Sequence, residues 1–507
     1  MKNARLLACF ASLLIPSALR ADVKCASVFT DHMVLQRDMP VPIWGAADAG
    51  EQVTVKVGGA IKTATADDKG KWSVKLDPLP AGGPITVEVA GKNALRFGDV
   101  LVGDVWVCSG QSNMSFALDR ADNAKEEIAA ADHPKIRLFS VPRKPSPTPL
   151  DSVKGDWEAC DPKTAPGFTA VGYFFGRDLQ KDLDIPIGLI HTSWGGTVAE
   201  AWTDSATLEG DADFADIVKR GKEYPTSYPK LAEQYEEKVK AFQAQHPGEK
   251  LPAALRKPQT PEEDPNLPSV LFNGMVAPLQ PYGIKGAIWY QGEANAGRAW
   301  QYRKLLPAMI KDWRSTWGEG DFPFLIVQLA NFGKDKPDGG STWAELREAQ
   351  ALTARNVPHC GMSVTIDIGN PANIHPTDKQ DVGKRLALQA EKLVYGRDVL
   401  EAGPTYVSMA VDGPAIRVKF DHVGGGLAPK GDKLEGFSIA GEDQKFSPAE
   451  AKIDGDSVVV SSPSVAKPVA VRYGWANSPT CTLYNREGLP AAPFRTDDWK
   501  AVTIDAK

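Results

Sequence analysis

The sequence is poor in cysteine and has no excess of positive charge, and both deficits exclude classes of protein. Only 6 of its 507 residues are cysteines, and because no two form a Cys-x-x-Cys pair, a structural zinc site is not expected. Acidic residues outnumber Lys and Arg by 64 to 58, so the basic footprint of a nucleic-acid-binding protein is missing. Beyond the N-terminal segment, no apolar run is long enough to span a bilayer. We therefore expect neither a nucleic-acid partner nor a membrane span.

Residues 1–21 have the pattern of a secretory signal peptide. A basic start is followed by an apolar run, Leu6–Ile15, that is too short for a membrane span, and small residues up to Ala21 offer a cleavage point. We expect the protein to be secreted or periplasmic. Cleavage would also remove Cys9 and leave an odd number of cysteines, so at least one thiol stays free or pairs with another chain.

The chain is too long for one compact core, and its patterning divides it into three parts. Residues 22–100 alternate apolar and polar residues over short stretches between turns, which predicts a β-sandwich region. Residues 101–400 contain short, continuously apolar runs followed by helix-like sequence, which predicts an α/β domain with a parallel, doubly wound sheet. Within this domain, the charged and proline-rich residues 204–268 are predicted to form an inserted surface subdomain, with a polar helix around Leu231–Gln245. Residues 401–507 return to alternating strands and predict a C-terminal β region.

Five apolar runs are the predicted strands of the central sheet. They are residues 105–108, 187–190, 287–290, 324–327 and 362–366. The loops after four of these runs carry glycines and polar side chains, and ligand sites of open α/β sheets lie at the carboxyl ends of the strands. These loops are therefore the candidate site. The helix after the third run is expected to begin near Pro307, because proline suits a first helical turn.

The first of these loops contains Ser112, within Ser109–Met114. Gly110 permits a tight turn, and a serine at the start of a helix is exposed beside backbone N–H groups that can stabilise an oxyanion. Taken alone, the loop is explained better by a serine that caps the helix, which is a common role. The sequence lacks the Gly-x-Ser-x-Gly elbow, so the α/β-hydrolase fold proper is disfavoured.

Two further loops add backbone and side-chain donors. Gly195 and Gly196 follow the second run, and a glycine pair lets backbone N–H groups approach a ligand closely, although most such pairs are only turns. Gln291, Glu293 and Asn295 follow the third run. A surface loop would account for any one of these three, whereas all three at one strand end favour a site.

The fourth loop contains His375, followed by Pro376. A lone histidine is more often structural than catalytic, but this one falls between a strand and a helix in a neighbourhood that proline makes rigid. An imidazole titrates near neutral pH and can take and return a serine proton. Ser112 and His375 together therefore predict a nucleophile and its general base.

Four motifs together resemble the sialate O-acetylesterases of the SGNH-hydrolase superfamily. They are Cys108–Met114, Gly195–Thr197, Trp289–Asn295 and Ile374–Pro376. Further matches lie in the β regions, among them Phe29–Gln36 and Trp475–Asn477, so the resemblance covers nearly the whole chain after the signal peptide.

The resemblance implies an SGNH-hydrolase (flavodoxin-like) fold for the central domain and hydrolysis of O-acetyl esters on sugars. An O-acetylated sugar or glycan is then the partner, and no metal or cofactor is implied. Carried over by position, Ser112 is the nucleophile that forms an acetyl-enzyme, and His375 is the general base. The oxyanion hole would consist of the backbone N–H groups of Ser112 and Gly195 or Gly196, with the side-chain amide of Gln291.

The acid that orients His375 is left open. The superfamily usually places an aspartate three residues before the histidine, where this chain has Ala372. Glu293 is the first choice, and Asp367, at the end of the last predicted strand, is the second. A backbone carbonyl that holds the imidazole, leaving a Ser–His dyad, is the third.

Other readings of the sequence remain. Acetyl xylan and other plant polysaccharide esters present the same carbonyl as acetylated sialic acid, so an esterase for those substrates is an alternative. A non-catalytic carbohydrate-binding protein is a second, and the complete set of four loops argues against it. A glycosidase would need a second carboxylate about 5–9.5 Å from Glu293, and the loops offer none except Asp367.

Overall fold

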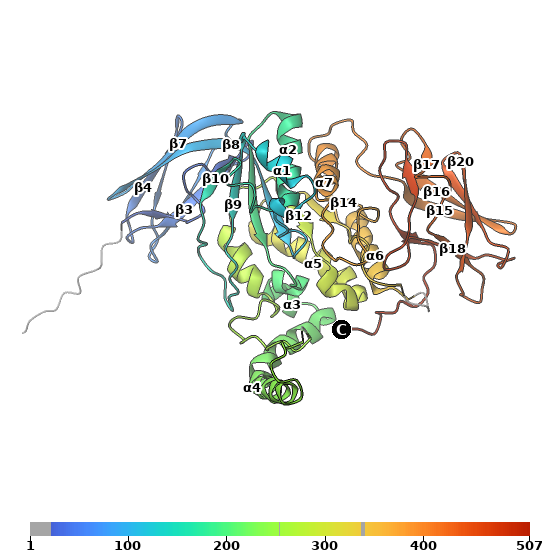
Figure 1. Cartoon of the computed structure of the whole chain (residues 1–507). Coiled ribbons are helices and arrows are strands. Elements are labelled where there is room, and N and C mark those ends of the chain that lie inside the picture. The colour runs from blue at the N-terminus through green and yellow to red at the C-terminus, as the bar shows by residue number, and fades with distance from the viewer. Residues whose placement is uncertain (1–21, 253, 336–339) are drawn as a thin grey trace, which may run out of the picture.

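The structure, a computed structural model, describes residues 22–252, 254–335 and 340–507 (Figure 1). The predicted signal peptide therefore lies outside the described residues. A central α/β part has a β part on either side, with the N-terminal strands at the left of Figure 1 and the C-terminal strands at the right. Among the described residues, no helix combines the length and the hydropathy that a membrane crossing needs.

Five parallel strands form the centre of the sheet, in the spatial order β11-β8-β12-β13-β14. They are β8 (Ala94–Gly110), β11 (Ile187–Ser193), β12 (Gly286–Tyr290), β13 (Phe324–Val327) and β14 (Cys360–Ser363). Parallel β9 (His133–Ser140) and antiparallel β10 (Trp157–Cys160) extend the β11 edge. Every residue of β12 and β13 is buried, because helices cover both faces, and this explains their continuously apolar sequence. The predicted α/β class is confirmed, although the last strand begins two residues earlier and ends at Ser363.

Two pairs of helices cover the two faces of this sheet. On one face lie α2 (Ala170–Leu183) and α7 (Gln380–Leu393), and on the other α5 (Ala299–Trp317) and α6 (Thr342–Asn356). Alternate strand residues enter the two cores, so Trp289 packs with α5 whereas Tyr290 packs with α2 and α7. The prediction that α5 begins near Pro307 is wrong. Buried residues before it, such as Tyr302 and Leu305, hold the preceding turns, and this packing outweighs the hydrogen bond that proline removes.

The N-terminal β region is continuous with the central sheet. One small sheet contains β1 (Lys24–Cys25), β3 (Val41–Ala46) and β6 (Lys71–Leu76). In the other layer, β2 (Val34–Gln36) and β7 (Gly82–Ala90) pair with β8, β4 (Gln52–Val57) pairs with β7, and β5 (Ala60–Thr65) pairs with β4. Alternate residues of both layers meet in one apolar cluster. Because β8 is 17 residues long, it passes without a break through the boundary predicted between residues 100 and 101.

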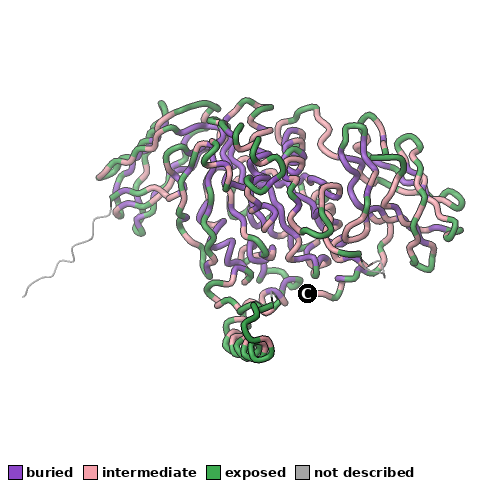
Figure 2. The backbone as a smooth tube through the Cα atoms, in the orientation of Figure 1, coloured by how far each residue is buried: buried purple, intermediate pink, exposed green. Residues whose placement is uncertain are grey.

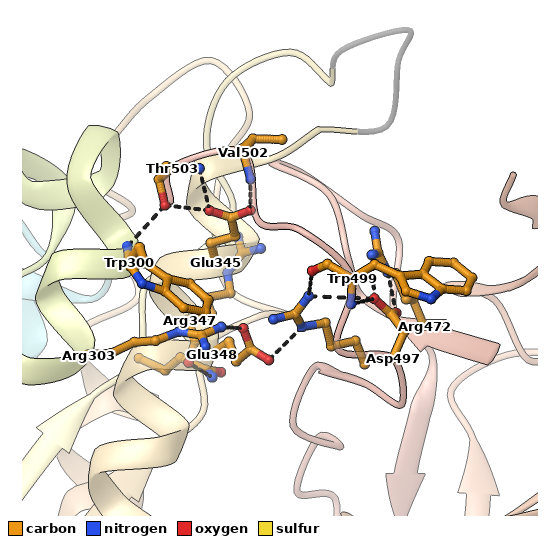
Figure 3. A network of polar contacts seen from close by, with 12 residues as sticks. Trp300, Arg303, Glu345, Arg347, Glu348, Arg472, Asp497, Trp499, Val502 and Thr503 are labelled. Carbon is orange, nitrogen blue, oxygen red and sulfur yellow. Dashed lines mark hydrogen bonds and ion pairs between the residues drawn. The ribbon is translucent and has the colours of Figure 1, made fainter. Parts of the chain in front are cut away.

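The C-terminal β region contains two four-stranded sheets and one strand pair. Its strands are β15 (Thr405–Asp412), β16 (Ala415–Asp421), β17 (Leu427–Pro429), β18 (Phe437–Ala440), β19 (Ser447–Pro448), β20 (Glu450–Asp454), β21 (Ser457–Ser461), β22 (Ala470–Tyr473), β23 (Leu483–Asn485) and β24 (Phe494–Arg495). Polar contacts fix this region to α6. Figure 3 shows Glu345 accepting bonds from the backbone N–H groups of Val502 and Thr503, at 2.6 and 3.0 Å. The buried guanidinium of Arg347 donates to the carbonyls of Ala476 and Asn477, so the region is attached rigidly.

Residues 204–268 form an arm that projects from the molecule (Figure 1) and is mostly exposed (Figure 2). Its helices are α3 (Ser205–Glu209), η3 (Ala212–Phe214) and α4 (Ala215–Gln245). The predicted helix is too short, since α4 has 31 residues and contains Pro225 and Pro229. Both prolines are exposed, so water can satisfy the carbonyls that lose a backbone partner. The remaining short helices are η1 (Leu118–Arg120), α1 (Ala124–Ala129), η2 (Ala199–Trp202), η4 (Phe272–Val276), η5 (Ala277–Leu279) and η6 (Glu293–Arg298).

Candidate active site

A cavity of about 230 Å³ lies at the carboxyl ends of β8 and β11. It is lined by Ser112, Ser115, Phe116, Arg120, Arg143, Trp194, Gly195 and His375. Three loops that are far apart in the sequence thus meet here, and they bring Ser112, Gly195 and His375 together as predicted. A larger hollow of about 850 Å³ lies in the C-terminal β region, but no histidine lines it.

The end of β8 presents Ser112 to the cavity. At Gly110 the backbone φ is 136°, and a Cβ atom would lie 2.2 Å from the carbonyl oxygen of Tyr290, so only glycine fits. The next N–H, of Gln111, donates to the same carbonyl at 2.9 Å. The residues after Ser112 form turns, so the helix-cap interpretation is wrong.

The cavity lining contains two hydroxyl groups, of which only Ser112 is unengaged. Ser115 Oγ donates to the carbonyl of Gln111 at 3.1 Å and lies 2.9 Å from Ser193 Oγ. The Ser112 hydroxyl makes no hydrogen bond to any residue that the structure describes. A nucleophile needs a hydroxyl that its base can reach, and Ser112 meets this condition better than Ser115.

Backbone donors surround Ser112. A Cβ atom on Gly195 would lie 3.1 Å from Ser112 Cβ, so the glycine loop touches the nucleophile loop directly. The N–H groups of Ser112, Gly195 and Gly196 find no acceptor within the described part of the chain. Unpaired, fixed N–H groups beside a nucleophile are the donors that an oxyanion hole requires.

The side chain of Gln291 points into the interior and does not line the cavity. It is fully buried, and its Nε2 donates to the carbonyl of Thr197 at 3.1 Å and to Asn295 Oδ1 at 2.6 Å, while its Oε1 accepts from the Tyr302 hydroxyl at 2.8 Å. Both amide protons are therefore committed, and the expectation that Gln291 donates to the oxyanion is wrong. Its bond to Thr197 instead ties the glycine loop to the end of β12.

His375 is half-buried, and its ring makes no hydrogen bond to another described residue. Burial lowers the pKa of His375, and the positive charges of Lys379 and Arg120 lower that pKa further. The imidazole is therefore neutral at neutral pH, which is the form that accepts a proton.

Neither predicted acid reaches His375. Asp367 forms a two-point ion pair with Arg385 at 2.7 and 2.8 Å and accepts from the Tyr484 hydroxyl at 3.2 Å. The carboxylate of Glu293 accepts from Asn113 Nδ2 at 2.6 Å, and burial raises its pKa. Asp367 is thus committed to other partners, whereas Glu293 Oε2 has no hydrogen-bond partner, and neither acid is bonded to the His375 ring among the described residues.

Several cavity residues were missed by sequence reasoning. Arg120, at the end of η1, and Arg143, on a loop, are exposed and belong to no motif, so nothing in the sequence directs them to the site. Lys379 stands between Asp378 and Gln380 in a polar stretch that is typical of a solvated helix start, yet it is fully buried. The other loop histidine, His191, lies 2.6 Å from Ser193 Oγ, and burial lowers its pKa to about 4, so it is a neutral structural partner.

Known proteins are similar to this chain over most of its length. The family model described as carbohydrate esterase, sialic acid-specific acetylesterase matches residues 102–244 and 268–392. Sialate O-acetylesterase of Mus musculus is 30% identical over 92% of this chain and 93% of its own, and that of Homo sapiens is 30% identical over 95% of each. A solved carbohydrate acetylesterase from Xanthomonas citri is 40% identical, with a TM-score of 0.82, over 94% of this chain and 100% of its own.

The fold is therefore that of a carbohydrate acetylesterase. The chain belongs to the sialic acid-specific acetylesterase family, and the resemblance predicted from the four motifs is confirmed. Membership makes it a carboxylic-ester hydrolase whose substrates are O-acetyl esters of sugars.

Proposed function

We propose that the protein is an exported O-acetylesterase with an SGNH-hydrolase fold that acts through an acetyl-serine intermediate on Ser112. The observation that carries this proposal is the cavity itself. It combines an unengaged serine hydroxyl, a histidine with a lowered pKa and unpaired backbone N–H groups. The order of the five central strands, β11-β8-β12-β13-β14, supports a flavodoxin-like fold. The signal-peptide pattern of residues 1–21 supports export, and cell fractionation tests it.

The two half-reactions use the same groups. Neutral His375 takes the proton of Ser112 as Oγ attacks the acetyl carbonyl, and the N–H groups of Ser112 and Gly195 stabilise the oxyanion. The imidazolium then gives its proton to the sugar oxygen as the ester C–O bond breaks, which leaves acetyl-Ser112. Water, deprotonated by His375, attacks this ester; the proton returns to Ser112, and acetate departs.

The charge of the cavity favours an acidic sugar. Arg120 and Arg143 both line it, and neither pairs with a carboxylate among the described residues. A sialic acid, the sugar in the names of the mammalian relatives, carries a carboxylate that either guanidinium could bind. Acetylated xylan or another neutral plant polysaccharide is the second candidate, because it offers the same acetyl ester without that charge.

Acetate release separates these possibilities. We expect acetate from O-acetylated sialic acid to exceed that from acetylated xylan, and we expect Arg120→Ala to raise KM for the acidic substrate only. Equal KM effects on p-nitrophenyl acetate would contradict the role of Arg120. Release of reducing sugar instead of acetate would favour a glycosidase, and binding without any turnover would favour a non-catalytic protein. Loss of acetate release in Ser112→Ala is expected for an esterase of either substrate class.

A further inference from the structure

A buried chain of three side chains lies behind the cavity and joins its two catalytic loops. Lys379 Nζ donates to Asn113 Oδ1 at 2.6 Å. The other end of the same amide, Asn113 Nδ2, donates to Glu293 Oε1 at 2.6 Å and to the carbonyl oxygen of Ile374 at 3.0 Å. One asparagine amide therefore contacts the loop after β12 and both sides of the loop that carries His375.

The positions of these contacts in the sequence are informative. Asn113 directly follows Ser112, whereas Ile374 directly precedes His375 and Lys379 lies four residues after it. The short loop that carries His375 is thus held on both sides by the residue next to the nucleophile. No carboxylate is hydrogen-bonded to the His375 ring in the described structure, so these contacts of Asn113 are a direct polar link between the two loops.

The chain is also balanced in charge. Lys379 is fully buried, and its ammonium lies 5.0 and 5.2 Å from the ring centres of Phe116 and Tyr290. The amide directs its oxygen at Lys379 Nζ and its nitrogen at the Glu293 carboxylate. Burial lowers the pKa of Lys379 to about 7 and raises the pKa of Glu293, and the charge of each group opposes the shift of the other. A buried charge without its partner is costly. Each group therefore depends on the other two.

We propose that Lys379, Asn113 and Glu293 form one positioning unit that sets the placement of His375 against Ser112. This inference rests on the proposed Ser112–His375 dyad. Lys379 and Glu293 are positioning residues here, because neither lines the cavity. In many serine hydrolases a carboxylate accepts a hydrogen bond from the catalytic histidine. In this chain the carboxylate of Glu293 accepts one from Asn113, the residue next to the nucleophile.

Lys379→Met tests the proposal, since methionine keeps the unbranched stem and removes the charge. We expect kcat to fall by about 10²-fold, the usual effect of a small misplacement, with KM unchanged because the cavity lining is intact. The acid limb of the pH profile of kcat/KM should also move to higher pH, because a cation that lowers the pKa of His375 is gone. The other positive charge that lowers this pKa, Arg120, and the second arginine of the cavity lining, Arg143, are unaltered. Lys384→Met, at an exposed position of α7, is the matched control and should behave as wild type.

Glu293→Gln is the second single variant, and together with the double variant Lys379→Met/Glu293→Gln it forms a double-mutant cycle. If the three residues act as one unit, the loss of kcat in Lys379→Met/Glu293→Gln is clearly smaller than the product of the single losses. Wild-type kcat and an unmoved acid limb in folded Lys379→Met, or multiplicative losses in the cycle, would overturn the proposal. If Lys379→Met does not fold, the kcat and acid limb of Glu293→Gln decide instead. Activity that persists in Ser112→Ala would refute the dyad itself, which is a separate outcome.

Discussion

A single methyl group at Gly195 is predicted to remove most of the turnover without harming the fold. The Cβ atom of Gly195→Ala would lie 3.1 Å from Ser112 Cβ, closer than an ordinary contact of 3.4–4 Å, so the two loops must separate by a few tenths of an ångström. The N–H groups of Ser112 and Gly195 are the donors that must converge on one oxyanion. Loss of one such donor costs about 10²–10³ in kcat, or about 2.7–4 kcal/mol of transition-state stabilisation.

Gly195→Ala is expected to change the stability of the fold only slightly. Gly195 is exposed and does not have a left-handed φ, so alanine is compatible with its backbone. Alanine also restricts the unfolded chain, which offsets part of the strain. Initial rates on p-nitrophenyl acetate, with thermal unfolding in parallel, measure both effects. Gly167→Ala is the control, because that glycine is exposed, has an ordinary φ and has no atom within 4 Å of an added Cβ. Unchanged kcat in Gly195→Ala would refute an oxyanion hole between these loops.

Three further predictions concern the groups around the dyad. Activity should fall as the pH drops through the pKa of His375, because the base must be neutral, and this pKa is expected below the ordinary value of 6.5. If kcat/KM already falls at a pH above 6.5, the environment described for this ring is contradicted. Asp367→Asn should lower stability by less than the about 3–5 kcal/mol of a fully unpaired buried charge, since Arg385 keeps its contact with Asp381, and should leave kcat near wild type. A large loss of kcat in a folded variant would restore Asp367 as the acid. Gln291→Met should lower the unfolding temperature and affect kcat only through the glycine loop, so a kcat loss with unchanged stability would return Gln291 to the oxyanion hole.

The parts of the site that sequence reasoning found follow from sheet geometry. Strands buried on both faces must be continuously apolar, and this marks β12 and β13 without ambiguity. Because parallel strands end at one edge of a sheet, Ser112 and Gly195 were predicted to meet there, and they do. Ser112 alone would have been taken as a helix cap; only the coincidence of several strand ends made it a nucleophile.

The parts that were missed depend on contacts between distant residues. Asp367 pairs with Arg385 and Glu293 with Asn113, while neither acid forms a hydrogen bond to His375, and no local pattern encodes either pairing. The burial of Lys379 could not be predicted either, because its neighbours in the sequence are polar. The predicted domain boundary between residues 100 and 101 falls inside strand β8. The alternation of apolar and polar residues stops there because the strand is covered on one face before this point and on both faces after it.

The most direct test of the account is the identity of the acetylated residue. Protein quenched during turnover of p-nitrophenyl acetate, digested and sequenced by mass spectrometry, should carry one acetyl group on Ser112, and Ser112→Ala should carry none and release no acetate. An acetyl group on Ser115, or wild-type turnover by Ser112→Ala, would contradict the central claim.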